Sequence, residues 1–342
     1  MKPRIAITVG DFNGIGPEVV LRSIRTKAVR ACCAPVLVGP ESVFRYYADL
    51  FGIPFAVSPL HSRHAAAQAP VLIASSDIAA ARIAPGVLAR GAGQAAAAAI
   101  AAAAAMAVRG EVAAVVTAPV SKQAMHRAGI RFPGQTEMVQ YLSGSPRVAM
   151  MLVSSGLRVG LVTIHIPLAA VARTITPALL ASRISVIHAA LRQDWGIAQP
   201  RLAVLGLNPH AGEGGDIGME ERRTIIPVVR RLQRRGMRIA GPFPADAFFA
   251  RYTPGMYDGI VAMYHDQGLI PLKMWAGGHA VNVSVGMRIV RTSPDHGTAF
   301  DIAGKGLADP ASMVEAILLA AQISRHRSSR IPRAQGSHDT IS

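Results

Sequence analysis

The sequence predicts an α/β protein with two domains and mainly parallel sheets. Short runs rich in Val, Ile and Leu alternate with longer helix-compatible stretches along the chain. Several of these runs are apolar on successive residues, which indicates strands buried on both faces, as in parallel sheets covered by helices. A chain of 342 residues can bury a large core and more often forms two domains than one.

Each expected element follows from its local pattern. Pro17 and Glu18 suit the start of the first helix, because proline fits a first helical turn and an acid favours the positive helix end. The segments 129–134 and 286–295 are candidates for a domain boundary. Strands are expected at 4–9, 35–39, 71–74, 112–117, 147–153, 158–164, 202–207, 259–264 and 280–285, and helices at 17–30, 93–109, 175–193, 220–235 and 310–323.

The charge pattern bears on the partners of this protein. The formal net charge is +16, and almost all of the positive charge is arginine. The arginines are dispersed, apart from 222–238 and 325–333, whereas a nucleic-acid-binding protein usually concentrates them in one patch with interleaved aromatics. We therefore expect no nucleic-acid partner. The excess positive charge favours an anionic small substrate and a dinucleotide.

Cysteine content and hydropathy bear on the compartment. The two cysteines, Cys32 and Cys33, are neighbours in sequence, and adjacent residues rarely form an unstrained disulfide. The first residues lead directly into a predicted strand, without the apolar region of a secretory signal. The Ala-rich run 95–105 is too short to cross a bilayer. We expect a cytoplasmic protein with no membrane partner.

Three histidines follow three predicted strands. His165 ends the run 159–164, His210 follows 202–207, and His265 follows 260–264. In open α/β sheets, ligands bind beyond the carboxyl ends of strands, so three imidazoles delivered there can hold one divalent metal with positions open for substrate. Each histidine alone can also be an ordinary loop or core residue, and the spacing by itself does not prove that they converge.

Basic and amide side chains follow the third histidine. Lys273, Asn282, Arg288 and Arg291 lie on or near the next predicted strand. Lysine and arginine there would bind phosphate or carboxylate, which arginine can do with two parallel hydrogen bonds. Surface charge is the alternative interpretation, especially for Arg288.

Two glycine-containing segments are candidates for nucleotide contact. The segment 10–18 joins the first strand to the first helix and can approach a phosphate closely. It lacks the G-x-G-x-x-G spacing, so it does not predict a Rossmann fingerprint. The small-residue segment 295–306 has a backbone that can lie against a flat ligand, which is weak evidence on physical grounds alone.

Taken together, these segments resemble the 4-hydroxythreonine-4-phosphate dehydrogenase family. The resemblance spans roughly residues 5 to 320 in the order of the family. It rests on Gly10-Asp11, Gly14-Ile15-Gly16-Pro17-Glu18, Thr117-Ala118-Pro119-Val120-Ser121-Lys122, Gly134-Gln135-Thr136-Glu137, Asn208-Pro209-His210-Ala211-Gly212-Glu213, Tyr264-His265-Asp266-Gln267-Gly268, Arg291-Thr292-Ser293 and His296-Gly297-Thr298-Ala299.

The resemblance implies the isocitrate/isopropylmalate dehydrogenase-like fold, with two α/β/α domains, an interdomain cleft and a homodimer whose active site is shared between subunits. Residues 1–130 with 290–325 would form the cofactor-side domain, 131–289 the metal-binding and dimerisation domain, and 326–342 a frayed tail. The implied metal ligands are His165, His210 and His265. The implied substrate contacts are Gln135, Thr136, Lys273, Asn282 and Arg291, and the adenosine-binding segment contains His296, Gly297, Thr298, Ala299 and Asp301.

The predicted function is the oxidation of 4-phosphohydroxy-L-threonine by NAD or NADP, with one divalent metal (Zn, Mg, Mn or Co). The product is a β-keto acid that decarboxylates to 3-amino-2-oxopropyl phosphate. Asp246 and Asp266 are candidates for orienting metal-binding imidazoles, and Lys122 is a candidate for proton transfer. The metal would lower the pKa of the substrate alcohol.

One departure from the family bears on the substrate. The family usually has histidine where this chain has Gln135. Glutamine can hydrogen-bond a hydroxyl or phosphate but cannot become a cation near neutral pH. Threonate or erythronate 4-phosphate and dihydrodiols therefore stay open as substrates. A metal hydrolase is one alternative function. A transferase such as the phosphate acetyltransferases, which have a related fold, is another.

Overall fold

The structure is a computed structural model that describes residues 2–56, 58–59, 71–73, 82–154 and 156–329. The strands in these ranges form one sheet in the order β3-β4-β2-β1-β5-β12-β11-β6-β7-β10-β8-β9. Their bounds are β1 Arg4–Thr8, β2 Ala34–Val38, β3 Ser58–Pro59, β4 Val71–Ile73, β5 Ala114–Val116, β6 Ala149–Ser154, β7 Leu157–Leu161, β8 Arg201–Leu205, β9 Arg238–Phe243, β10 Gly259–Ala262, β11 Val281–Val285 and β12 Arg291–Pro294.

The sheet is parallel on both flanks and antiparallel at its centre. The strands β3, β4, β2, β1, β5 and β12 are parallel to one another, and so are the strands β7, β10, β8 and β9. The central pairs β12–β11, β11–β6 and β6–β7 are antiparallel. The prediction of a mainly parallel α/β protein is confirmed, but the antiparallel centre joins both halves into a single sheet.

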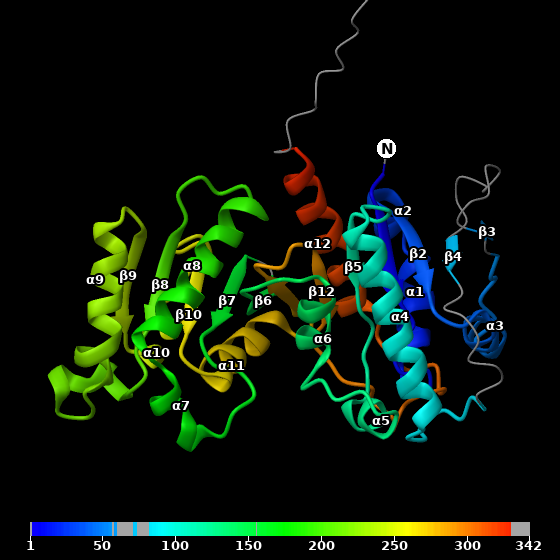
Figure 1. The fold of residues 1–342 in the computed structure, drawn as a ribbon, viewed down its shortest axis with the longest axis horizontal. Helices are drawn as coiled ribbons and strands as arrows, with labels where there is room; N and C mark the ends of the chain where they lie inside the picture. Colours follow the sequence, from blue (N-terminus) through cyan, green and yellow to red (C-terminus); the bar gives the residue numbers. More distant parts are fainter. Residues whose placement is uncertain (1, 57, 60–70, 74–81, 155, 330–342) are drawn as a thin grey trace, which may run out of the picture.

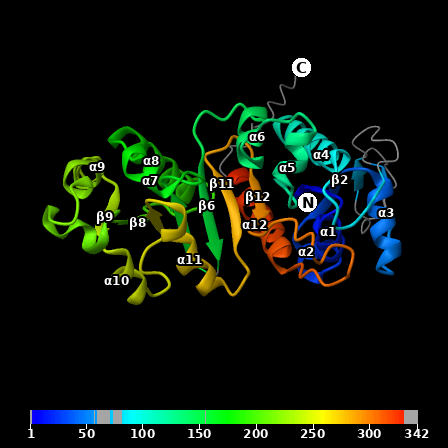
Figure 2. The ribbon, with the colours of Figure 1, turned by 90° about the horizontal axis from the view of Figure 1, so that it is seen from below.

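Helices pack around this sheet. The helix bounds are α1 Gly16–Ile24, α2 Lys27–Cys32, α3 Glu41–Leu50, α4 Arg90–Val108, α5 Lys122–Arg127, α6 Gln135–Leu142, α7 Leu168–Thr174, α8 Pro177–Gln193, α9 Ile226–Arg234, α10 Ala245–Ala250, α11 His265–Ala276 and α12 Ala311–Ser328. A π-helical turn, Glu221–Ile225, precedes α9. Figures 1 and 2 show two lobes, one with α1 to α5 and one with α7 to α11, and the central strands with α12 between them.

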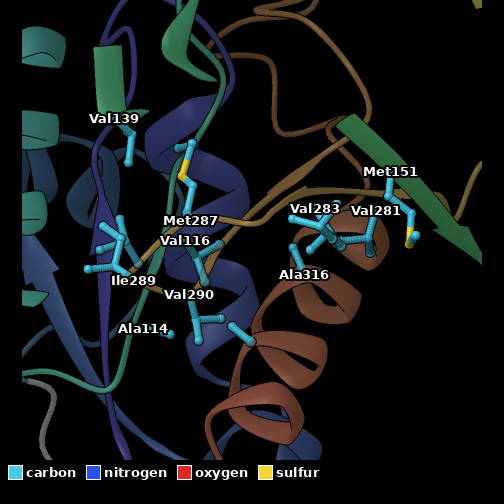
Figure 3. Packing of buried hydrophobic residues seen from close by; sticks show 14 of the residues in the cluster. Ala114, Val116, Val139, Met151, Val281, Val283, Met287, Ile289, Val290 and Ala316 are labelled. Carbon is cyan, nitrogen blue, oxygen red and sulfur yellow. The ribbon is translucent and has the colours of Figure 1, made fainter. Parts of the chain in front are cut away.

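The central core forms where α12 covers the middle of the sheet. Val281 and Val283 of β11 point to the same face because strand residues alternate with a period of two. Figure 3 shows both side chains beside Ala316 of α12 and Met151 of β6. Their exposed fractions are at most 3%. The intervening residue Asn282 is therefore directed to the opposite face.

The bounds of the two predicted domains stay a proposal. In that proposal, one boundary falls between β11 and β12. Residues 326–328, which were predicted to belong to a frayed tail, are helical. The helix α12 continues through Ser328, and Arg327 forms an ion pair with Asp194 at 2.6 Å. Residues 330–342 of the predicted tail lie outside the described residues.

The alanine-rich helix α4 is longer than the run 95–105 that marks it in the sequence. Its 19 residues are long and apolar enough to cross a membrane by length and composition. However, 56% of its most apolar window is buried inside the protein. A Cβ on Gly93 would lie 2.2 Å from the carbonyl oxygen of Ala124, so α4 and α5 pack backbone to backbone. This close packing is typical of a core helix.

Candidate active site

Two of the three predicted metal ligands lie side by side. The strands β7 and β10 are parallel neighbours, with Ile260 paired to Val159, so their carboxyl ends coincide. His165 follows the first strand, and His265 opens α11 after the second. Their ring centroids are 5.8 Å apart. The two histidines that follow these strands therefore lie together, and their role as metal ligands stays a prediction.

Gly268 allows α11 to approach the sheet. A Cβ at this position would lie 2.7 Å from Cγ1 of Val159 and 3.0 Å from Cβ of Ala262. The first turn of α11 therefore rests directly on β7 and β10, which brings His265 to the level of His165. The glycine lies inside the helix, because α11 continues through it to Ala276.

A cavity of about 340 Å³ opens at the histidine pair. Partial burial lowers the pKa of His165, and the charges of Lys122 and His265 lower it further. A lowered pKa favours the neutral imidazole, which is the form that binds metals. The cavity is lined by Ile164, His165, Ile166, Leu168, Val171, Tyr264, His265 and Asp266.

Asp266 fixes the orientation of its neighbour. Its Oδ1 lies 2.7 Å from Nδ1 of His265, which leaves Nε2 of that ring for a ligand. This contact fits the predicted orienting role. Asp246 is exposed on α10 and forms no hydrogen bond or ion pair with any residue in the described ranges. Its role stays a prediction.

His210 lies on a strained turn. Residues 210 to 214 all have positive φ, between 43° and 82°, and three of them are not glycine. Left-handed conformations of non-glycine residues are unfavourable and concentrate at functional sites. The imidazole is exposed, and its Nδ1 lies 2.9 Å from Oε2 of Glu213. Among the described residues, no group of three His, Cys, Asp or Glu side chains can hold a metal. A single chain therefore brings together two of the predicted ligands and not all three.

A buried carboxylate anchors this turn. Glu221 is 1% exposed and accepts hydrogen bonds from the backbone N–H groups of Leu207 and Asn208, at 2.7 and 2.8 Å. Gln267 on α11 donates to the carbonyl oxygen of Gly206 at 2.6 Å. The segment before His210 is thus tied to the helix that begins at His265.

The guanidinium of Arg291 is buried among neutral oxygens. The residue is 2% exposed, and burial lowers its pKa to about 10, an effect that the charge of Glu137 opposes. All five of its N–H donors have partners, but none of these is a carboxylate. The acceptors are Thr117 Oγ1 (3.1 Å from Nε and 2.6 Å from Nη2), Ser284 Oγ (3.1 Å from Nη1), Thr136 Oγ1 (3.3 Å from Nη1) and Gln135 Oε1 (3.2 Å from Nη2).

The other two predicted substrate contacts, Asn282 and Lys273, lie on β11 and α11. Asn282 and Ser284 share one face of β11, and Oδ1 of Asn282 is buried without a hydrogen-bond partner. Lys273 is exposed on α11 and forms an ion pair of 3.1 Å with Asp295. A ligand with a hydrogen-bond donor would satisfy the buried acceptor of Asn282, and a ligand with an anionic group would pair with the exposed ammonium of Lys273.

Glu137 and Lys122 connect the histidine pair with Arg291. A Cβ on Gly134 would lie 3.0 Å from Oε2 of Glu137 and 3.7 Å from Cε of Lys122, so both side chains border the start of α6. The charge of Glu137 acts on both His165 and Arg291. These residues therefore belong to one electrostatic environment.

The predicted cofactor segment packs on the glycine-rich turn after β1. The N–H of Ile15 donates to the carbonyl oxygen of Thr298 at 2.9 Å, and a Cβ on Gly14 would lie 2.7 Å from the same oxygen. Nε2 of His296 is buried without a partner, and a Cβ on Gly297 would meet open space. Ala299 has a φ of 41°, and Asp301 is exposed.

Sequence reasoning missed several of these residues. Ser284 is a single hydroxyl residue in β11, and no spacing marks it. Thr117 lies within a quoted motif, but no role was assigned to it. Glu137 and Gln267 lie within the quoted motifs but carried no assigned role. Glu221 stands 11 residues after His210 in an arginine-rich stretch that indicates a solvated helix. Its burial follows from tertiary packing.

Comparisons with known proteins bear on this arrangement. The sequence model of the family described as "Pyridoxal phosphate biosynthetic protein PdxA" matches residues 31–320. The chain belongs to the PdxA family. A 4-hydroxythreonine-4-phosphate dehydrogenase from Trichlorobacter lovleyi is 42% identical over 332 residues, which cover 95% of this chain and 99% of that protein.

Two further relatives support the assignment. A D-threonate 4-phosphate dehydrogenase from Cupriavidus necator is 43% identical and covers 95% of this chain and 98% of its own. The crystal structure of a 4-hydroxythreonine-4-phosphate dehydrogenase from Klebsiella pneumoniae superposes with a TM-score of 0.85 at 38% identity, over 94% of this chain and 100% of its own. The predicted family, the isocitrate/isopropylmalate dehydrogenase-like fold and the dehydrogenase class of this PdxA-family member are confirmed.

Proposed function

We propose that this protein oxidises the secondary alcohol of 4-phosphohydroxy-L-threonine, with NAD or NADP as the hydride acceptor. The alcohol carbon loses a hydride to the nicotinamide and the hydroxyl loses a proton, which leaves a β-keto acid. Loss of carbon dioxide from that acid gives 3-amino-2-oxopropyl phosphate. The relatives named 4-hydroxythreonine-4-phosphate dehydrogenase support this substrate.

The buried cation of Arg291 carries the proposal. A guanidinium with no carboxylate partner and a neutral shell of oxygens is electrostatically prepared for an anion. Its five donors are already occupied, so a substrate oxygen must replace a partner. The longest contacts, to Thr136 and Gln135, both involve the terminal nitrogens. A phosphate or carboxylate would therefore approach that edge of the guanidinium and displace one of these two side chains.

Asn282 and Lys273 would complete substrate binding. The buried Oδ1 of Asn282 lacks a donor, and a substrate ammonium or hydroxyl would supply one. Lys273 would exchange its ion pair with Asp295 for a contact with the anionic end of the substrate. Because Asp295 precedes the cofactor segment, this exchange would link substrate binding to that segment.

The histidine pair fits a divalent metal in part. His165 favours its neutral form, and Asp266 leaves Nε2 of His265 available. Two ligands from one chain are fewer than a stable site needs, so we propose that His210 of the partner subunit supplies the third. When bound, a divalent metal would act as a Lewis acid that lowers the pKa of the substrate alcohol. Histidine ligands suit zinc or cobalt better than magnesium.

An apolar surface beside the histidines supports a homodimer. The exposed fractions of Met274, Ile270 and Leu168 are 81%, 57% and 72%. Ile270 and Met274 lie one turn apart on α11, and Leu168 borders the cavity at His165. Exposed apolar patches of this kind mark interaction surfaces, and a two-fold contact here would bring a partner chain to the candidate active site.

Gln135 favours a second candidate substrate. Its amide oxygen accepts a hydrogen bond from Arg291, and its amide nitrogen donates to the carbonyl oxygen of Ala118 at 3.4 Å. A protonated histidine could donate a hydrogen bond but could not accept one. Threonate 4-phosphate, a substrate suggested by the name of the Cupriavidus relative, is therefore the alternative.

A substrate panel tests the proposal. Purified protein is incubated with NAD or NADP and with 4-phosphohydroxythreonine, threonate 4-phosphate, erythronate 4-phosphate or a dihydrodiol, with and without a chelator. We expect reduced nicotinamide with 4-phosphohydroxythreonine, loss of activity with chelator, and recovery after addition of zinc or cobalt. Reduced nicotinamide with threonate 4-phosphate alone would replace the proposed substrate by the alternative. No reduction with any compound would overturn the proposal.

A further inference from the structure

The turn after β1 is buried along its whole length. Residues 10–18 are all buried, so this turn supports the segments around it and does not present itself to a phosphate. Asn13 lies in the middle of the turn and is 0% exposed. A polar side chain that is buried this completely needs hydrogen-bond partners inside the protein.

The partners of Asn13 lie in a distant segment of the chain. Its Nδ2 donates to the carbonyl oxygen of Val87 at 2.8 Å, and its Oδ1 accepts from the N–H of Ala84 at 2.9 Å. Its backbone carbonyl oxygen accepts from the N–H of Gly86 at 2.7 Å. One residue thus holds the segment 84–87, which precedes α4, by three hydrogen bonds.

This segment lies directly against the small-residue segment 295–306, which contains the predicted cofactor residues. A Cβ on Gly86 would lie 3.0 Å from the carbonyl oxygen of Phe300. A Cβ on Gly304 would lie 2.8 Å from Cβ of Pro85. The two segments therefore pack so closely that a larger residue at either glycine would push them apart.

The same turn also holds the cofactor segment. The N–H of Ile15 donates to the carbonyl oxygen of Thr298 at 2.9 Å. The N–H of Asn13 donates to Oδ1 of Asp11 at 3.0 Å, which fixes the turn itself. Because Asn13 and Ile15 are two residues apart in one buried turn, the geometry of this turn sets the position of the segment 84–87 relative to Thr298.

Both segments leave surface that a flat ligand can use. Val87 is 54% exposed, although its carbonyl oxygen is fixed by Asn13, so an apolar side chain is held in one place at the surface. Gly297 is exposed, and a Cβ there would meet open space. A dinucleotide carries two flat heterocyclic rings, which suit an exposed aliphatic side chain and an open stretch of backbone.

We propose that Asn13 is a positioning residue for the dinucleotide and that the segment 84–87 forms a second wall of its site. Asn13 does not touch the dinucleotide. It fixes the backbone of Val87, whose side chain packs against one ring of a dinucleotide bound at the segment 295–306. This inference rests on the proposed dinucleotide-dependent oxidation, and it adds the residues that keep the cofactor site in shape.

Direct binding of NADH and NADPH to the full-length protein, without substrate, tests the inference. The fluorescence of the reduced nicotinamide gives the Kd. Asn13→Ala removes both side-chain hydrogen bonds to the segment 84–87, and we expect Kd to rise about tenfold. Val87→Ser removes the apolar contact, and we expect a rise of about fivefold. Val87 is exposed, so this variant decides the matter if Asn13→Ala fails to fold in a thermal unfolding control.

Each variant has a matched control. Ser324→Ala removes a buried hydrogen bond on α12, from Oγ to the carbonyl oxygen of Ala320 at 2.6 Å. Val108→Ser changes a valine that is 56% exposed at the end of α4. Both controls should bind the dinucleotide like the wild type. In turnover, Asn13→Ala should raise KM for the dinucleotide, while kcat and KM for the alcohol substrate stay within about twofold, a pattern that a general loss of stability would not produce.

Three results would overturn the inference, and only the first would also overturn the proposed function. The first is that the wild type binds neither NADH nor NADPH. The second is that the wild type binds one of them and that Asn13→Ala and Val87→Ser leave its Kd unchanged. The third is equal weakening by Asn13→Ala and Ser324→Ala with no effect of Val87→Ser, because the loss would then come from general instability.

Discussion

Thr117 Oγ1 accepts two hydrogen bonds from Arg291, one from Nε at 3.1 Å and one from Nη2 at 2.6 Å. A single hydroxyl at the end of β5 thus holds the inner edge of a guanidinium that has no carboxylate partner. The outer edge is held more loosely, by Thr136 and Gln135. This arrangement leaves a buried positive charge whose most replaceable contacts lie where the substrate is proposed to bind.

Replacing Arg291 tests whether that charge binds substrate. Arg291→Lys keeps a cation but loses the planar fork, and we expect kcat/KM to fall by about 100-fold, the effect of losing one or two charged hydrogen bonds. Steady-state kinetics with 4-phosphohydroxythreonine measures this change. Arg288→Lys, an exposed arginine nearby, is the matched control. Equal effects of the two variants would argue against a substrate role.

Gln135→His tests the residue that departs from the family. A neutral imidazole can accept from Arg291 and donate to Ala118, but an imidazolium cannot accept. We expect the variant to lose kcat/KM as the pH falls below about 6.5, the ordinary pKa of histidine, while the wild type shows no such additional loss. The order of preference in the substrate panel should also change. An unchanged order would mean that Gln135 does not set specificity.

Asp11 should make the stability of the protein depend on pH. Burial raises the pKa of Asp11 from 3.8 to about 6, against the effect of the N–H of Asn13. Between these values the unfolded chain has released a proton that the folded chain keeps, so this contribution to stability falls as the pH rises and stays low above about pH 6. Asp11→Asn removes the effect and should gain up to about 3 kcal/mol relative to wild type between acid and neutral pH.

Denaturant unfolding at both ends of this window measures the gain. Asp49→Asn, an exposed carboxylate on α3, is the control and should show no such difference. A constant difference between Asp11→Asn and the wild type across the window would show that Asp11 ionises normally in the folded protein.

Asp266→Asn tests the orientation of His265. The carboxylate lies 2.7 Å from Nδ1 of the imidazole, and loss of such a partner typically costs about 10- to 100-fold in metal affinity. Competition with a chromogenic chelator measures the affinity for zinc. Glu41→Gln, far from the site on α3, serves as the control. An unchanged affinity would remove Asp266 from the proposed metal site.

Much of the sheet could be predicted from the sequence because its strands are buried on both faces. The runs at 35–39 and 202–207 are apolar on successive residues, and both form strands there. The strand β12 was missed. Its sequence, Arg-Thr-Ser-Pro, lacks apolar residues, yet all four residues are buried at the centre of the sheet. The strand contains Arg291 of the candidate site, and its polar residues lack the apolar pattern by which the other strands were predicted.

The site itself was predicted only in part. The pair of His165 and His265 follows from the rule that ligands lie at the carboxyl ends of parallel strands. The conformation of His210 could not be predicted, because its left-handed turn depends on the distant carboxylate of Glu221. The neutral shell of Arg291 comes from three separate segments, and their convergence depends on the antiparallel centre of the sheet, which no local pattern indicated.

The central proposal is a metal-dependent dehydrogenase whose metal is held by His165 and His265 of one subunit and His210 of the other. His210→Ala and His265→Ala are each expected to be inactive alone. Co-refolding the two variants is the most direct test, because each mixed dimer would contain one site with all three histidines. We predict that dehydrogenase activity and zinc binding return in the mixture. Mixed dimers that form but stay inactive and bind no zinc would contradict a shared site.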